Sequence, residues 1–285
     1  MKFLYTSDLH GETILYEELY SLTLAFSIEI IGLGGDLLPS FPPTKQHQDM
    51  IPYQQTFIGQ FLLPFFTRIL NQTPVKKIFL IPGNWDLGYF YLLKNPIENV
   101  IHLDQAIYRL EDGYELIGYS IVPPTPFRPK TYEKRDDREA PWPPQKNPSY
   151  ILSSIQNGRL TPVDPYLYLR QRETIQDDLP RLPNPLDPKK AIYIMHSPPF
   201  GTKLDLTTGK NSVGSRSIKA FIEQKQPFLT LHGHIHESPN ISGAYLDRIG
   251  KTLSLNPGQF IFPKLQALTF EIENVEETLQ HTCYP

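Results

Sequence analysis

The stretch MKFLYTSDLH, residues 1–10, contains the pattern that decides the fold. The run from Phe3 to Thr6 is mostly apolar and typical of a buried strand, and two metal-ligand side chains, Asp8 and His10, follow it directly. In an extended segment residues i and i+2 project to the same side, so this carboxylate and this imidazole can bind one ion together. Open α/β sheets place their ligands just beyond the carboxyl ends of strands. These residues therefore predict an α/β protein with a metal site at the edge of a sheet.

The same arrangement of an apolar run and a polar end recurs along the chain. The further runs that we predict to be buried strands are Ile28 to Leu33, Lys77 to Ile81, Ala191 to Met195, Phe228 to Leu231 and Thr252 to Leu255. The first four of these lead, in order, into Gly34-Gly35-Asp36, Pro82-Gly83-Asn84-Trp85-Asp86, His196 and Gly233-His234-Ile235-His236. Each piece alone occurs often by chance, but five in order, each after a predicted strand, form a strong joint signal for one site.

Helical segments separate the first three strands. We expect helices over Thr13 to Phe26 and Tyr53 to Asn71, which makes the N-terminal half a βαβαβ unit with a largely parallel sheet. A second group of strands, over Ile107 to Leu110, Tyr114 to Ser120 and Leu265 to Ile272, could supply another sheet. The pair Asp112-Gly113 indicates a hairpin turn between the first two of them.

The segment from Pro123 to Pro188 differs from the rest because it holds 14 of the 29 prolines. Proline at that density interrupts both helices and strand ladders. We expect helices there only over Pro148 to Gly158 and Pro165 to Leu179. The aromatic content favours a packed surface excursion over a partly ordered linker. The expected organisation is one domain, residues 1–285, with a proline-rich insertion at about 123–190 that serves either as a lid or specificity insert or only as surface structure.

Bulk properties exclude several classes of protein. A net charge of −3 and a pI near 6.2 give no general attraction to nucleic acid or to an anionic membrane. Cys283 is the single cysteine, so no intramolecular disulfide exists, and we interpret it as an inert thiol. No apolar run approaches the ~20 residues of a membrane helix, and residues 1–6 form a predicted strand instead of a leader. A cytoplasmic location is the expectation; the oligomeric state is not indicated.

The candidate ligands have a definite chemical preference. They comprise four imidazoles, two carboxylates and one amide, from Asp8, His10, Asp36, Asn84, His196, His234 and His236. Hard oxygen ligands mixed with imidazole suit Mn²⁺, Fe or Zn²⁺ better than Ca²⁺.

This series of motifs resembles the calcineurin-like metallophosphoesterase superfamily, and especially a small bacterial and archaeal phosphodiesterase-like branch. The resemblance implies an α/β fold of four layers, an αββα sandwich of two mixed sheets. It implies Asp8, His10 and His236 on one metal, Asn84, His196 and His234 on a second, and Asp36 bridging both. It further implies a hydrolase that attacks a phosphoester with a metal-bridging hydroxide, with Asp36, Asn84 and Asp86 among the catalytic residues.

The sequence leaves alternatives open for the substrate and for the reaction class. A small-molecule phosphodiester is slightly preferred to a monoester such as a nucleotide. A noncatalytic partner-binding module on the same fold and a DNA-repair nuclease are rivals; the acidic charge disfavours nucleic acid. Asp86 either orients a metal-bound histidine or the loop, or caps an Asx-type turn.

Trp85 departs from the family pattern, which in many relatives has a histidine acid at this position. An indole can donate a hydrogen bond but cannot release a proton near neutral pH. We interpret Trp85 as packing against the site wall in preference to stacking on substrate. His47 and His102 are possible replacement acids, although His102 looks structural, and His232 is either a core residue or a hydrogen bonder to the site. Several cations are candidate phosphate contacts, although most are expected to be solvated: Arg128, Lys130, Lys134, Arg135, Lys203 and Arg216.

Overall fold

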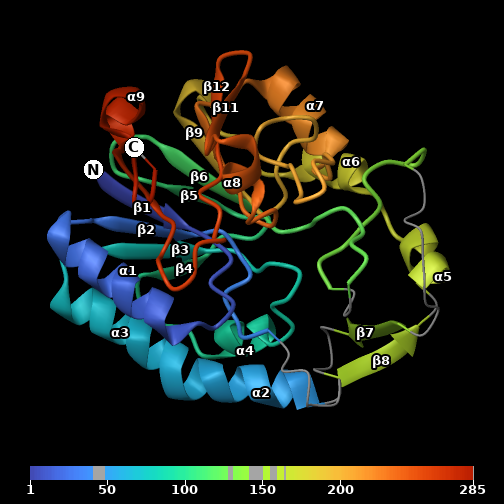
Figure 1. Ribbon diagram of the computed structural model, residues 1–285, viewed down its shortest axis with the longest axis horizontal. Coiled ribbons are helices and arrows are strands. Elements are labelled where there is room, and N and C mark those ends of the chain that lie inside the picture. The colour runs from blue at the N-terminus through green and yellow to red at the C-terminus, as the bar shows by residue number, and fades with distance from the viewer. Residues whose placement is uncertain (41–48, 128–130, 141–149, 155–158, 164, 285) are drawn as a thin grey trace.

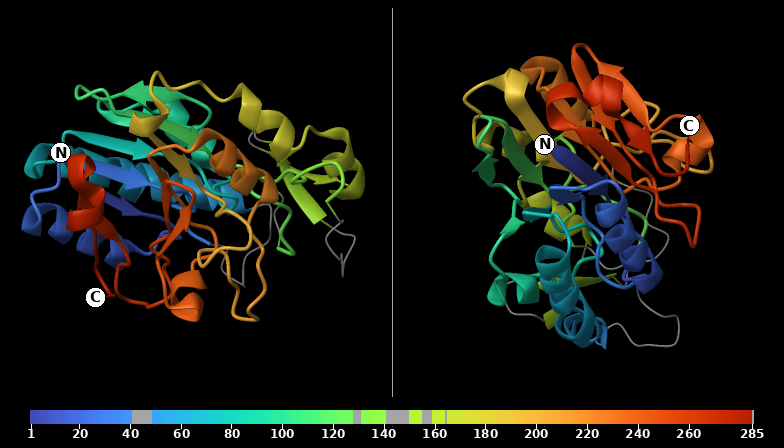
Figure 2. Two further views of the ribbon diagram at one scale, coloured as in Figure 1. Left: turned by 90° about the horizontal axis from the view of Figure 1, so that it is seen from above. Right: turned by 90° about the vertical axis from the view of Figure 1, so that its left-hand side faces the viewer.

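The chain forms two six-stranded sheets that pack face to face (Figures 1 and 2). The computed structural model describes residues 1–40, 49–127, 131–140, 150–154, 159–163 and 165–284. Within these ranges no helix has the length and hydrophobicity that crossing a membrane requires.

The first sheet has the strand order β14-β13-β1-β2-β3-β4. Its strands are β1 (Lys2–Thr6), β2 (Ile30–Leu33), β3 (Lys77–Leu80), β4 (Val100–His102), β13 (Leu268–Glu271) and β14 (Gln280–His281). Strands β1 to β4 are parallel, whereas β13 pairs antiparallel with β1 and β14 antiparallel with β13. The predicted βαβαβ unit is confirmed.

The second sheet has the order β11-β12-β10-β9-β6-β5. Its strands are β5 (Ile107–Arg109), β6 (Glu115–Tyr119), β9 (Ala191–Met195), β10 (Leu229–Leu231), β11 (Leu246–Ile249) and β12 (Thr252–Leu255). The four central strands are parallel and both edge strands antiparallel. The predicted hairpin at Asp112-Gly113 joins β5 to β6. The predicted grouping of strands is wrong for residues 265–272, because β13 joins the first sheet beside β1.

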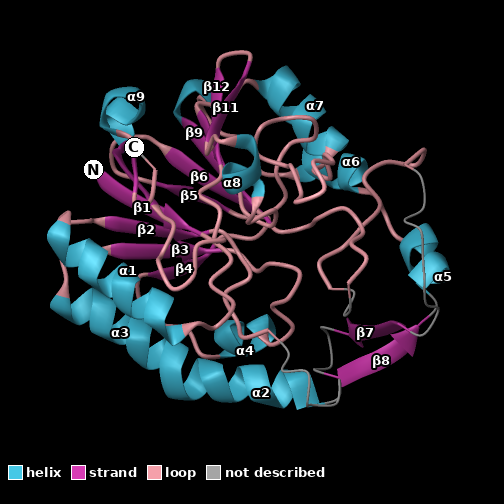
Figure 3. Cartoon of the chain, in the orientation of Figure 1, coloured by secondary structure: helices cyan, strands magenta, loops and turns pink. Residues whose placement is uncertain are grey.

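Helices cover the outer faces of both sheets (Figure 3). The helices of the described ranges are α1 (Thr13–Ala25), α2 (Met50–Phe57), α3 (Leu63–Gln72), α4 (Tyr89–Lys94), α5 (Pro165–Gln171), α6 (Ile175–Asp178), α7 (Arg216–Lys225), α8 (Ser238–Ser242) and α9 (Val275–Thr278). Of these, α1 and α3 pack on the first sheet, and α6 and α7 pack on the second. Short 3₁₀ turns occupy Leu179–Arg181, Pro188–Lys190 and Ile272–Asn274. The helix predicted over residues 53–71 is interrupted by a π-helical turn, Ile58–Leu62, just before Pro64, which has no N–H to donate to the preceding turn.

The alternation of side chains along each strand creates the four layers. In β1, Phe3 and Tyr5 lie in the core between the sheets, while Leu4 packs with the helices outside. In β9, Tyr193 faces outward and contacts Phe221 of α7, with ring centroids 5.3 Å apart. Strands buried on both faces read as continuous apolar runs, which is why they are visible in the sequence.

The insertion contains less helix than expected. The helix predicted over residues 148–158 is wrong: Tyr150–Ser154 form β7, which pairs antiparallel with β8 (Arg159–Val163). In the sequence between these segments, the pair Asn157-Gly158 is typical of a hairpin turn, and the prediction from the proline content did not take it into account. The helix predicted over residues 165–179 is divided into α5 and α6, because Thr174 caps α6 by accepting a hydrogen bond from the N–H of Asp177 (3.2 Å).

Buried polar contacts fasten part of the insertion to the second sheet and its helices. The carboxylate of Asp136 accepts hydrogen bonds from the Ser215 hydroxyl and from the N–H of Arg216 (2.7 Å) at the start of α7. The Lys134 ammonium forms a salt bridge of 2.7 Å with Asp178 of α6, and only 13% and 9% of these side chains are exposed. The charge of Lys134 is therefore buried, contrary to the expectation that it is solvated.

Candidate metal centre

The loops that follow β1 and β2 lie side by side at the carboxyl end of the first sheet. The N–H of Asp8 donates to the carbonyl of Gly35 (2.9 Å), and the N–H of His10 donates to the carbonyl of Asp36 (2.8 Å). This continues the strand pairing beyond the strands themselves and brings the two carboxylates to the same edge. The Asp8 carboxylate also accepts from the Ser7 hydroxyl (2.5 Å) and from the N–H of His234 (3.0 Å).

Glycine permits the close approach of the next loop. A Cβ atom on Gly83 would lie 2.1 Å from Oδ1 of Asp36, and one on Gly233 would lie 2.6 Å from Oδ2 of Asp8. Side chains at these positions would displace the carboxylates. The glycines in the Gly83-Asn84 and Gly233-His234 motifs therefore have a steric explanation.

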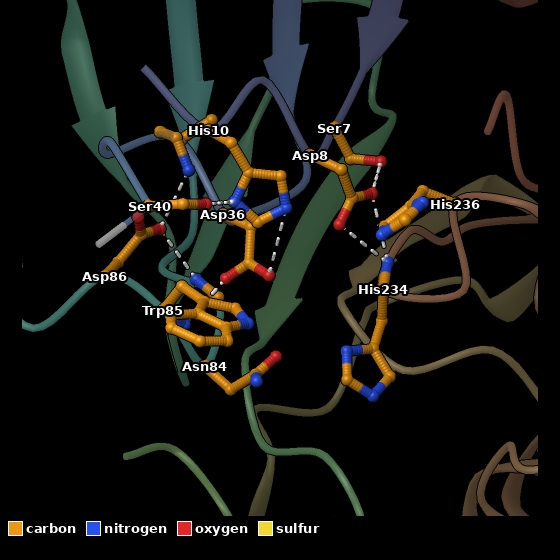
Figure 4. A network of polar contacts seen from close by, with 12 residues as sticks. Ser7, Asp8, His10, Asp36, Ser40, Asn84, Trp85, Asp86, His234 and His236 are labelled. Atoms are coloured by element: carbon orange, nitrogen blue, oxygen red, sulfur yellow. Dashed lines mark hydrogen bonds and ion pairs between the residues drawn. The ribbon is translucent and has the colours of Figure 1, made fainter. Parts of the chain in front are cut away.

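Asp36 is the side chain on which the candidate ligands converge (Figure 4). Its Oδ2 lies 3.5 Å from Nε2 of His196 and 3.9 Å from Nε2 of His10, while its Oδ1 accepts from the N–H of Trp85 (2.8 Å). Two groups of ligand atoms, each within 4.8 Å, share this residue: Asp8, His10 and Asp36 form one, and Asp36, His196 and His234 the other. Both groups have the size and donor types of a site for a divalent metal.

The remaining two candidates lie at either side of these groups. Oδ1 of Asn84 is 3.3 Å from Nε2 of His196. The rings of His236 and His10 meet edge to face with centroids 6.0 Å apart. Nδ1 of His236 is buried and has no hydrogen-bond partner among the described residues, although the Glu237 carboxylate lies 3.7 Å away. A buried nitrogen without a partner is costly unless a ligand satisfies it, so the donor set fits a bound metal.

The tautomer of His196 follows from its surroundings. Its Nδ1 lies 2.7 Å from the carbonyl oxygen of Gly34, which can only accept, so Nδ1 carries the hydrogen and Nε2 faces Asp36 and Asn84. This is the usual arrangement of a metal-binding histidine, in which a backbone carbonyl orients the ring.

The charges of the site depend on one another. Burial lowers the pKa of His196, but the Asp36 carboxylate outweighs this and raises it to about 9. Burial alone would raise the pKa of Asp36, yet His196 and His10 hold it well below its usual range. Burial, with His196 next, lowers the pKa of His234 to about 3, so this imidazole stays neutral. Without cations, a protonated His196 balances the Asp36 carboxylate, and metal binding would release that proton.

Four of the candidate ligands have left-handed backbone conformations. Their φ angles are 59° for Asp8, 45° for His10, 52° for Asp36 and 65° for His234. Non-glycine residues adopt this region only at a cost, and such residues cluster at binding sites where the surrounding structure holds them in place. Here the four residues with this conformation all belong to the two overlapping groups of ligand atoms.

Asp86 contacts the backbone of neighbouring loops. Its carboxylate accepts hydrogen bonds from the N–H groups of Leu37 (3.2 Å), Leu38 (2.8 Å) and Gly83 (2.8 Å). Within the described ranges it makes no hydrogen bond to a histidine. Of its expected roles, orientation of the loops is the one that these contacts support. Burial, followed by the charge of Asp36, raises its pKa to about 7.

Sequence reasoning missed the residues that hold these loops. The Asn256 amide donates to the carbonyl of Leu204 (3.0 Å) and, at 3.4 Å, to those of Gly233 and Ile235 on either side of His234. Oγ of Ser40 lies 3.1 Å from Nδ1 of His10. Asn256 directly follows the strand predicted over residues 252–255, and this position could have indicated a role in the site. No sequence pattern indicates a role for Ser40.

The other candidate histidines are placed as follows. His232 is buried, with Nδ1 2.9 Å from the carbonyl of Ser197 and Nε2 2.8 Å from the Thr230 hydroxyl, which is the expected core position. Burial lowers its pKa to about 4. Nδ1 of His102 is 2.9 Å from the Tyr89 hydroxyl, in agreement with a structural role. His47 lies outside the described residues.

The candidate cations show no common orientation. Arg216 is exposed and stacks on the Phe200 ring at 3.9 Å, and Lys203 is exposed. Arg135 donates to the carbonyl of Arg138 at 3.1 Å. Arg128 and Lys130 lie outside the described residues.

Taken together, fold and site define an α/β sandwich protein with a candidate metal centre where the carboxyl ends of its parallel strands meet. The chain belongs to the calcineurin-like phosphoesterase family, whose profile matches residues 1–238. This membership supports a metal-dependent phosphoester hydrolase.

Solved structures with a TM-score above 0.5 share the fold at low sequence identity, and one with a lower score is also similar to the chain. One matches at a TM-score of 0.58 and 14% identity, over 100% of this chain and 99% of the other. Protein TT1561 of Thermus thermophilus matches at a TM-score of 0.53 and 16% identity, over 98% and 97% of the two chains. An archaeal phosphodiesterase matches at a TM-score of 0.46 and 12% identity, over 99% and 98%. No curated protein sequence matches the chain significantly.

Proposed function

We propose that this protein hydrolyses a small phosphoester, with a phosphodiester preferred to a monoester, at a centre of two divalent transition-metal ions. The ligands in this proposal are Asp8, His10 and His236 for one ion, Asn84, His196 and His234 for the other, and Asp36 for both. The observation that supports it best is that Asp36 belongs to two overlapping groups of ligand atoms.

The residues of the site have different roles in the proposed reaction. When bound by the ligands named above, two cations would supply Lewis acidity and would lower the pKa of a water in the site. Asp36 and His196 orient each other through their contact of 3.5 Å, and the Gly34 carbonyl fixes the direction of the His196 ring. Asp86 holds the loops of Leu37 and Gly83 in register, so that Asp36 keeps its position.

The preference for a diester rests on Trp85. Its backbone N–H is bound to Asp36, so the residue stands beside the site, at a sequence position where many relatives have a histidine acid. An indole cannot supply a proton near neutral pH, so leaving groups that depart as weak bases are favoured in diesters and monoesters alike. The preference for a diester follows from the resemblance, because relatives that lack this histidine are found among small phosphodiesterases.

A metal-dependent activity screen tests the proposal. Protein stripped with a chelator is reconstituted with Mn²⁺, Fe²⁺ or Zn²⁺ and assayed with bis(4-nitrophenyl) phosphate, 4-nitrophenyl phosphate and cyclic nucleotides. We expect turnover only with metal, and faster turnover of the diester. His196→Ala serves as the inactive control. Turnover that is undiminished without metal would contradict the proposed centre, and no turnover of any phosphoester would favour a noncatalytic module on this fold.

A further inference from the structure

Trp85 has a fixed backbone and a half-buried side chain next to the candidate metal centre. Its N–H donates to Oδ1 of Asp36 (2.8 Å), and its carbonyl accepts from Nε2 of the buried Gln54 (2.8 Å). The indole packs against a small apolar cluster that includes Met50 and Leu87. Figure 4 shows it beside Asp36 and on the same side as the Asn84 amide. The ring is therefore held in one place at the edge of the centre.

A second aromatic ring from the insertion lies close to this indole. The ring centroids of Phe127 and Trp85 are 6.4 Å apart and inclined by 45°, and 57% of Phe127 is exposed. The N–H of Phe127 lies within 3.4 Å of the Thr125 hydroxyl, which donates to the buried Glu133 carboxylate (2.7 Å). The insertion thus presents an exposed phenylalanine beside the site instead of burying it.

The pair leaves part of the Phe127 ring open to a ligand. Exposure of more than half of Phe127 forgoes most of the stabilisation that a buried phenylalanine provides. The indole N–H has no hydrogen-bond acceptor within the described part of the chain, so it is available to a ligand. The faces that such a pair leaves exposed can stack on a planar ligand ring, and the stacking tolerates different rings because each has a π-face.

We propose that Trp85 and Phe127 form an aromatic subsite that stacks on a planar ring of the substrate. The substrate is then a phosphoester of an alcohol that carries an aromatic or heteroaromatic ring, a chemistry that nucleosides and benzylic alcohols share. The inference rests on the proposed function, because the metal centre supplies the site to which the ring-bearing ester is brought.

The kinetic test compares substrates that differ only in the ring. One pair is the methyl phosphodiesters of a nucleoside and of ribose, both esterified at the 5′ oxygen; the other is the methyl phosphodiesters of benzyl alcohol and of cyclohexylmethanol. Within each pair the leaving groups are closely matched in basicity. We expect Phe127→Ala to lower the selectivity for the ring-bearing member about 5- to 100-fold, chiefly through KM, as the loss of one stacking contact predicts.

Matched variants separate stacking from disturbance of the fold. Phe127→Tyr keeps an aromatic ring and should retain the selectivity. Phe26→Ala, which removes an exposed phenylalanine at the far end of α1, should leave it unchanged. If only the nucleoside pair responds to Phe127→Ala, the ring is a nucleobase; if only the benzyl pair responds, it is a simple aryl group. Equal changes for both members of each pair would overturn the subsite and leave the proposed hydrolysis intact.

A binding measurement is independent of turnover. The chain has two tryptophans, so Trp142→Phe leaves Trp85 as the single indole. In metal-free protein, adenosine 5′-monophosphate or benzyl phosphate should quench its fluorescence, whereas ribose 5-phosphate and cyclohexylmethyl phosphate should not, and Phe127→Ala should weaken the quenching. No quenching by either ring-bearing ester at any concentration would overturn the subsite. Quenching in a protein that hydrolyses no phosphoester would retain the ring-binding site and reject the proposed function.

Discussion

At the level of single residues, Asp36 has the largest expected effect. Asp36→Asn keeps the volume of the side chain and the acceptor for the Trp85 N–H, but removes the negative charge that both ligand groups share. We expect kcat to fall about 100-fold or more at saturating metal, with little change in the circular dichroism spectrum. The control is Asp112→Asn, which alters an exposed aspartate in the β5–β6 turn. Near-normal turnover with full metal content would mean that Asp36 is not a bridging ligand.

Trp85 offers a residue-level test of the missing acid. Without a proton donor, the rate should rise steeply as the pKa of the leaving group falls, because a weakly basic oxyanion departs unassisted. Trp85→His should flatten this dependence if the imidazole reaches the leaving oxygen. Rates are measured across a series of aryl and alkyl diesters, with metal content checked for each protein. A wild-type rate that is indifferent to leaving-group pKa, with chemistry rate-limiting, would indicate that another group already supplies the proton.

At the level of elements, the contact between the insertion and α7 is open to measurement. Asp136 is buried and accepts from backbone N–H groups at the first turn of the helix, where a carboxylate also favours the helix dipole. We expect Asp136→Ala to lower the free energy of unfolding by about 1–3 kcal/mol, measured by urea denaturation. Glu139→Ala, an exposed change in the same segment, should cost less than about 0.5 kcal/mol. If Asp136→Ala and Glu139→Ala lowered the free energy of unfolding equally, Asp136 would not be the residue that fastens the insertion to α7.

Elements that are buried on both faces could be predicted closely from the sequence. The strand expected at residues 191–195 begins and ends as predicted, because its uninterrupted apolar run has no other stable placement in a sandwich. The strand expected at residues 252–255 does so as well, and there the sequence Thr-Leu-Ser-Leu alternates with the period of a strand. The sheet to which a strand belongs could not be predicted in the same way. Strand β13 pairs with β1 across more than 260 residues, and no local pattern encodes such a partner.

The candidate site, too, could be predicted only in part from the sequence. Its ligand-type residues follow strands, so their identity was visible in a single pass along the chain. The groups that hold them were not, since Gln54 and Ser40 contact residues 31 and 30 positions away. A glutamine or a serine in a polar segment looks like any surface residue until the chain is folded.

At the level of the whole molecule, the candidate centre draws ligands from both sheets. Asp8, Asp36 and Asn84 follow strands of the first sheet, and His196 and His234 follow strands of the second. Bound metal should therefore tie the sheets together and stabilise the native state, by about 2.7 kcal/mol at a metal concentration 100 times Kd. Thermal unfolding with and without a chelator measures this, and Asp36→Asn should lose most of the shift. A Tm that is independent of metal would contradict a centre shared between the sheets.

The left-handed backbone of the ligand loops also has an evolutionary consequence. A glycine at His10 would relieve its φ of 45°, so the metal-free His10→Gly protein should gain up to about 1 kcal/mol of stability while losing a candidate ligand. Ser27→Gly, which relieves a φ of 53° at a residue that is no candidate ligand, shows how much relief alone provides. Selection for stability and selection for metal binding then favour opposite residues at position 10, and a lineage released from catalysis would be expected to lose this histidine early.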